Sequence, residues 1–111
     1  MTNILKYDIV IVRFPFASSL KYKARPAVII SSKQYNSNKR ETLLIMAISS
    51  ATSNKLDFEA ILENWKDSGL EKASVFKASI ATIERDFIIT KVGSLSVRDK
   101  ENLDKMIDNI C

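Results

Sequence analysis

Histidine is absent from the chain, and the single cysteine is its last residue, Cys111. The missing imidazole excludes Ser-His-Asp and Cys-His catalysis as well as histidine-ligated zinc. One cysteine forms neither an internal disulfide nor a cysteine metal cluster. We therefore expect no metal and no cofactor, and any catalysis must use other groups.

Glycine, proline and long apolar runs are also scarce. Two glycines and two prolines provide no flexible linker, and the longest apolar run, Leu43 to Ile48, has six residues. A membrane-spanning helix needs about 20 apolar residues, and a leader peptide needs a basic-then-apolar start that this sequence does not have. These features predict a cytoplasmic protein without a membrane partner. The length of 111 residues predicts one domain over residues 1–111.

Positive charge is concentrated in the first half of the chain. Residues 1–55 contain nine Lys or Arg against two acidic residues, whereas residues 56–111 contain eight against eleven. Such segregation is typical of a face that binds a polyanion, although a basic face that contacts only solvent gives the same pattern.

The hydrophobic pattern predicts a mainly β fold that ends in an α-helix. Runs rich in β-branched and aromatic residues predict strands at 7–14, 25–31, 42–48, 56–62, 73–83 and 87–95, with Pro26 at the entrance of the second. A helical period joins Leu103, Met106, Ile107 and Ile110, and Ser96 and Asp99 are placed as an N-cap pair. We expect a strongly bent antiparallel sheet or partly open barrel, with the helix covering an edge or open end.

Three basic side chains, Lys21, Lys23 and Arg25, precede the second predicted strand. Proline restricts the residue before it to extended backbone conformations, so Arg25 has few orientations ahead of Pro26. A guanidinium presented in this way suits a bidentate contact with phosphate. A solvated basic loop is the alternative interpretation.

Two serines, Ser49 and Ser50, end the third predicted strand, where a hydroxyl can point into a cleft. Serines at strand ends also form turns with their own backbone, and without histidine neither is an activated nucleophile.

Trp65 is interpreted as a core residue rather than a platform for base stacking. The acidic residues without a metal-binding spacing are interpreted as surface charge: Asp57, Glu59, Glu63, Asp67, Glu84 and Asp86.

A basic domain without histidine or metal can still cleave RNA, because the substrate supplies its own nucleophile, the 2′-hydroxyl. The protein then has to hold an in-line geometry and stabilise charge on the phosphorane and the leaving oxygen. A rigid arginine and a hydroxyl donor would each contribute about 3 kcal/mol to that transition state. DNA offers no such route.

Several segments extend in order over nearly the whole chain and are followed by the closing helix: YDIVIVRFPF, KARPAVIIS, LLIMAISS, NWKDSGLEKASV and IATIERDFIITKVGSLS. Taken together, they resemble the MazF and PemK toxins of bacterial toxin-antitoxin systems. The resemblance implies a strongly twisted, SH3-like barrel of the MazF, PemK and CcdB type, paired as a homodimer whose groove holds RNA. It also implies sequence-specific, metal-independent cleavage of single-stranded mRNA to a 2′,3′-cyclic phosphate and a 5′-hydroxyl. A cognate antitoxin with an acidic C-terminal segment would neutralise the toxin.

By this resemblance, Arg25 matches the catalytic arginine of the family, and Ser49 stands where the family has a catalytic threonine or serine. Lys21, Lys23 and Ser50 are expected to bind the RNA. The general base is not identified.

Three regions depart from the family pattern. Tyr7 replaces a common glycine, Leu20 and Lys21 replace a Glu-Gln pair of some members, and Phe76 to Ala78 carries neither an arginine nor an aspartate that some members have. The departures favour a rival function, a catalytically inactive protein that binds nucleic acid or antitoxin, whereas the retained arginine and serine favour an enzyme. A gyrase poison like CcdB is a third alternative, which rests on the fold alone.

Overall fold

Six antiparallel strands and a C-terminal helix dominate the part of the chain that the computed structural model describes, residues 4–15 and 22–111. The strands are β1 (Asp8–Pro15), β2 (Tyr22–Ile29), β3 (Thr42–Ser49), β4 (Ala60–Ile61), β5 (Val75–Glu84) and β6 (Ile88–Ser94). The helices are α1 (Lys33–Asn36) and α2 (Val97–Ile110), and two 3-10 turns are η1 (Thr52–Asn54) and η2 (Arg85–Phe87). No helix in these described ranges is long and apolar enough to cross a membrane.

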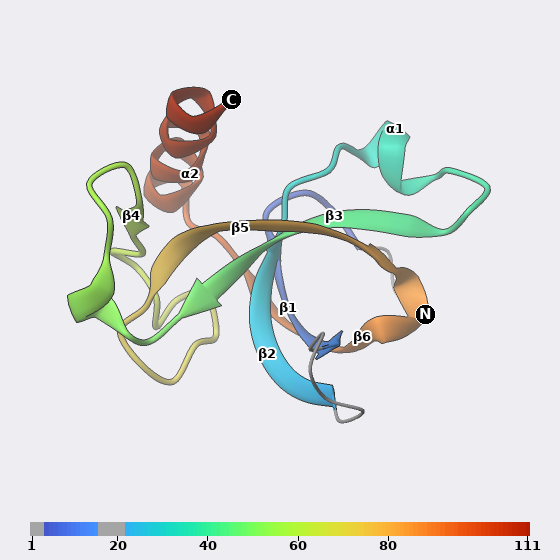
Figure 1. Ribbon diagram of the computed structural model, residues 1–111, viewed down its shortest axis with the longest axis horizontal. Coiled ribbons are helices and arrows are strands. Elements are labelled where there is room, and N and C mark those ends of the chain that lie inside the picture. Colours follow the sequence, from blue (N-terminus) through green and yellow to red (C-terminus); the bar gives the residue numbers. More distant parts are fainter. Residues whose placement is uncertain (1–3, 16–21) are drawn as a thin grey trace.

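The strands form one sheet in the order β4-β5-β3-β2-β1-β6. Figure 1 shows that the sheet is strongly bent, with β3 and β5 arching across the layer of β1 and β2. The pairing is antiparallel throughout, with register shifts between β1 and β6 and between β3 and β5. Such irregularities increase the local twist of a strand pair. The predicted mainly β fold with a terminal helix is confirmed.

Both faces of the central strands are covered by apolar side chains. Alternation along a strand sends Ile9 and Val28 into one buried cluster, and Val10 and Ile29 into another. The first cluster also contains Leu103 of α2. Because a strand buried on both faces reads as a continuous apolar run, the segments around residues 9–12, 27–30 and 43–48 show no alternation in the sequence.

Helix α2 packs against the first cluster through the predicted helical stripe, in which Leu103 and Met106 are buried. Ser96 is its N-cap and accepts the Asp99 N–H at 3.2 Å, as expected for an N-cap serine. The carboxylate of Asp99, fully buried, accepts the N–H groups of Glu63 and Asn64 at 2.8 and 2.9 Å. The helix start is thereby joined to the turn that precedes β5.

Three details differ from the expectation. Strand β2 begins at Tyr22, so Pro26 lies inside the strand, paired with Ile11, rather than at its entrance. Proline is tolerated there because the β2–β3 ladder begins only at Ala27, beyond the missing N–H. The loop after β2 contains the short helix α1, and the strand expected at 56–62 is reduced to β4.

Tyr7 stands where the family pattern described above has a common glycine. Its backbone is left-handed, with φ of 75°. This conformation suits glycine and costs other residues about 1–2 kcal/mol. The Tyr7 hydroxyl donates to the Asp104 carboxylate at 2.9 Å, and the ammonium groups of Lys6 and Lys100 lie 5.2 and 5.3 Å from the ring centre. Burial raises the pKa of Tyr7, and the hydrogen bond and charge of Asp104 raise it further. These contacts offset the backbone strain.

Candidate functional site

A cavity of about 370 Å³ lies where β2 and β3 meet the segment 69–74. This volume falls within the range of small-molecule and cofactor sites. Its polar walls include Arg25 from β2, Ser49 and Ser50 from the end of β3, and Glu71 and Lys72 from the segment before β5. The predicted catalytic pair is therefore found in one cavity.

The sheet register explains why Arg25 and Ser49 meet. Strands β2 and β3 pair Ala27 with Ala47 at the end of their ladder, and Arg25 and Ser49 each lie two residues beyond that pair, at the same end of the two strands. The side chain of Arg25 is exposed, and within residues 4–15 and 22–111 no carboxylate forms an ion pair with it. Its guanidinium is thus available to an anionic ligand.

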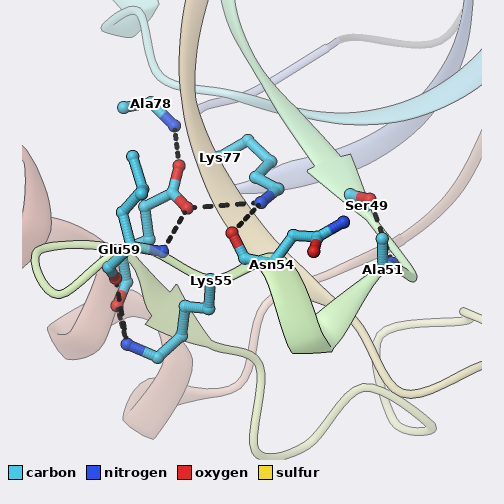
Figure 2. Close-up of polar contacts among 8 residues, drawn as sticks. Ser49, Ala51, Asn54, Lys55, Glu59, Lys77 and Ala78 are labelled. Atoms are coloured by element: carbon cyan, nitrogen blue, oxygen red, sulfur yellow. Dashed lines mark hydrogen bonds and ion pairs between the residues drawn. The ribbon is translucent and has the colours of Figure 1, made fainter.

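Ser49 combines both interpretations of its sequence position. Its Oγ accepts the Ala51 N–H at 3.0 Å, which is the turn-forming hydrogen bond expected of a serine at a strand end (Figure 2). A hydroxyl that accepts one hydrogen bond still has its own proton to donate. The turn therefore orients the Ser49 hydroxyl and leaves it able to donate to a ligand in the cavity.

The three predicted RNA-binding residues are placed differently. Ser50 is exposed and lines the cavity. Lys23 is exposed on β2, two residues before Arg25 and hence on the same face of the strand, but it is not part of the cavity wall. Lys21 lies outside the described residues, as does Leu20.

Glu71 and Lys72 are cavity residues that the sequence pattern did not single out. Both are exposed, and within the described parts of the chain neither forms an ion pair. The sequence feature that could have identified them is their position immediately after Gly69 and Leu70, in NWKDSGLEKASV, one of the segments that resemble the toxin family. Among the described residues that line the cavity, Glu71 is the one that carries a carboxylate.

The wall that carries these residues is placed by the two glycines of the chain. Gly69 has φ of 88°, and a Cβ built on it would lie 2.2 Å from the Val92 carbonyl oxygen. A Cβ on Gly93 would lie 2.3 Å from the Ser68 carbonyl oxygen. The turn before residue 70 and strand β6 thus cross backbone to backbone, which only residues without a side chain permit.

One acidic residue assigned to the surface is buried. Glu59 is 7% exposed, and the N–H groups of Leu56 and Ala78 and the ammonium of Lys77 surround its carboxylate. Burial alone would raise the pKa of Glu59, but these hydrogen bonds and the charge of Lys77 outweigh it and lower the pKa.

Within residues 4–15 and 22–111, no group of three acidic or cysteine side chains is arranged to hold a metal ion.

The departures at Phe76 and Ala78 have structural explanations. Phe76 is fully buried in the first apolar cluster, together with its partner across the ladder, Ile48. Ala78 is exposed, and its N–H donates to Glu59 Oε2 at 2.8 Å. Trp65, half-buried, packs against the same cluster, which confirms it as a core residue.

Together these features define a small, bent antiparallel-sheet protein whose cavity combines an oriented hydroxyl with an arginine that forms no ion pair among the described residues. The model of the family described as PemK-like, MazF-like toxin of type II toxin-antitoxin system matches residues 5–111. The chain therefore belongs to the PemK/MazF toxin family. Comparison with curated proteins gave no match.

Solved structures share the fold. A mycobacterial endoribonuclease in complex with its cognate antitoxin superposes with a TM-score of 0.75 and 14% identity, covering 98% of this chain and 93% of that one. Toxin MazF-mt6 of Mycobacterium tuberculosis gives a TM-score of 0.74 and 20% identity, covering 92% and 93%. A further mycobacterial endoribonuclease gives 0.72 and 14%, covering 98% and 91%. At these identities, the similarity establishes the fold.

Proposed function

We propose that this toxin is an endoribonuclease that cleaves single-stranded mRNA through the substrate's 2′-hydroxyl, without a metal ion. The observation that carries the proposal is that Arg25 and Ser49 line the same cavity. Membership of the PemK/MazF family and the fold shared with endoribonucleases support it.

Each polar group has a role in the proposed reaction. The 2′-oxygen bonds to phosphorus while the bond from phosphorus to the 5′-oxygen breaks, which leaves a 2′,3′-cyclic phosphate and a 5′-hydroxyl. Arg25 stabilises the charge on the phosphorane, and the Ser49 hydroxyl donates to a non-bridging oxygen. Because a guanidinium keeps its proton in proteins, the leaving oxygen takes a proton from water. Lys23 and Ser50 bind the RNA beside the reacting phosphate.

The cavity itself offers a general base. Of the residues that line it in the described chain, Glu71 carries a carboxylate, and its exposed side chain can reach a bound ligand. We assign to Glu71 the removal of the 2′-hydroxyl proton. Proton transfer of this kind accelerates reactions by about 10²–10⁴-fold.

The partners follow from the same charges. We propose a cognate antitoxin whose acidic C-terminal segment binds the cavity cations and so competes with RNA phosphates. The antitoxin bound to a structural neighbour supports this partner. We likewise propose that the toxin is a homodimer and acts in the cytoplasm.

The direct test uses purified protein and labelled RNA in excess EDTA. We expect cleavage with a 2′,3′-cyclic phosphate and a 5′-hydroxyl at the new ends, and a rate that falls steeply with added salt as phosphate contacts release counterions. An RNA with one 2′-deoxynucleotide at the cleavage position is the matched control, and it should resist cutting there. Binding without cleavage would identify the inactive binding protein instead.

The Glu71 assignment has its own test. Glu71→Gln keeps the size of the side chain but removes the base, so it should lower kcat by at least about 10²-fold with little change in RNA binding. Lys72→Gln, at the neighbouring cavity position, is the control that should weaken RNA binding but leave kcat close to the native value. A native kcat in Glu71→Gln would show that another group removes the proton.

A further inference from the structure

In the segment 50–59, which connects Ser49 to β4, side-chain contacts add to the backbone hydrogen bonds of its turns. Lys77 Nζ donates to the Asn54 carbonyl oxygen at 3.1 Å, five residues after Ser49 (Figure 2). Lys55 Nζ donates to the carbonyl oxygens of Leu56 and Glu59 at 3.1 and 3.0 Å. The segment is thus tied both to itself and to β5.

Glu59 is the centre of these contacts. Its Oε1 accepts the Leu56 N–H at 2.9 Å and lies 3.3 Å from Lys77 Nζ, while its Oε2 accepts the Ala78 N–H at 2.8 Å. Continuing the β4–β5 register would place Phe58 opposite Ala78, but the sheet pairing ends at Ala60. The carboxylate therefore takes the place of a backbone carbonyl on an otherwise unpaired edge N–H.

The contacts of Lys77 adjoin Ser49 in two ways: along the chain, through Asn54, and across the sheet, through the pairing of β3 with β5. Strand β5 pairs Val75 with Ser49 and Phe76 with Ile48, and the next pair in the ladder is Ile80 with Met46. Residues 77–79 thus form a bulge next to the end of β3, and the Glu59–Lys77 pair joins this bulge to the residue before β4. Through Asn54, the same lysine holds the turn in which Ala51 donates to Ser49.

We infer that the Glu59–Lys77 ion pair is a positioning pair that holds the turn after β3 and thereby orients the Ser49 hydroxyl toward the scissile phosphate. Neither residue lines the cavity, so neither contacts the reacting atoms. Glu59 is buried and Lys77 is partly buried, so breaking their hydrogen-bonded ion pair would leave the buried carboxylate without its charged partner. The catalytic part of this inference rests on the proposed RNA cleavage, whereas the orientation of Ser49 does not.

The test removes the cation and follows two independent readouts. Lys77→Met removes the ammonium and keeps an unbranched side chain one atom shorter. Arg98→Met is the matched control, because Arg98 pairs with Glu63 on an exposed surface and does not line the cavity. We expect the Ala51 amide proton to exchange at least about tenfold faster in Lys77→Met, because its turn opens more often. The exchange should stay unchanged in Arg98→Met and return to the native rate in Lys77→Arg.

A double-mutant cycle gives the second readout. Lys77→Met should lower kcat by about 10-fold to 100-fold with little change in KM. In a Ser49→Ala background it should have almost no further effect, because a residue that acts through Ser49 has nothing left to orient. Independent, multiplying losses would overturn the inference, and Glu59→Gln repeats the cycle if Lys77→Met unfolds. If the native chain does not cut RNA, the proposed function fails, and an unchanged Ala51 exchange rate would overturn the positioning role separately.

Discussion

Arg25→Ala should lower the rate of RNA cleavage by about 10²–10³-fold, as removal of one preorganised donor to a developing charge does in other enzymes. In the proposed reaction the phosphorane gains negative charge, and Arg25, which lines the cavity, is the residue proposed to stabilise it. The folded structure should be unaffected, since the Arg25 side chain is exposed and no ion pair of the described chain depends on it. Single-turnover cleavage and urea unfolding of the same preparation measure the two effects.

Two further variants show what the arginine does. Arg25→Lys keeps the charge but not the planar fork, so it should recover only part of the rate. Ser49→Ala removes a neutral donor and should lose less than Arg25→Ala, because hydrogen bonds from charged donors are stronger. In cells, both alanine variants should relieve growth arrest. An Arg25→Ala protein that still cuts RNA at the native rate would refute the assignment of the site.

Gly93→Ala should strongly destabilise the protein although it adds a single methyl group, lowering the free energy of unfolding by about 3 kcal/mol or more. The added Cβ would lie 2.3 Å from the carbonyl oxygen and 2.8 Å from the carbonyl carbon of Ser68. Both atoms are backbone, so the turn before residue 70 has to move as a whole. Unlike Gly69, Gly93 has no positive φ, so the effect measures the close approach alone.

Urea denaturation measures this effect, and the neighbouring strand residue provides the control. Ser94 is exposed, and Ser94→Ala should change the free energy of unfolding by less than about 0.5 kcal/mol. Because the displaced turn leads into Glu71 and Lys72, the folded fraction of Gly93→Ala should also cleave RNA more slowly. A Gly93→Ala protein of native stability would show that the turn and β6 do not cross as closely as the structure indicates.

Local patterns predicted most of the secondary structure. The strands around residues 7–14, 42–48 and 87–95 lie close to their predicted positions. Their signal, a β-branched run bounded by polar residues, consists of residues that are neighbours in the chain. The terminal helix follows from its apolar period and from Ser96. Strand β4 is shorter than predicted, and Glu59, which the alternating pattern predicted to face outward, is buried and binds Lys77 and Ala78.

The absence of histidine and of any internal cysteine limits the chemistry of this chain whatever its fold, because a side chain that is not there cannot react. Residue order also placed Arg25 before a proline and Ser49 at a strand end. Their meeting in one cavity depends on the β2–β3 register, and the presence of Glu71 there depends on two glycines at a crossing of distant segments. Register, backbone approach and buried ion pairs are contacts between residues far apart in the chain, so no local periodicity encodes them.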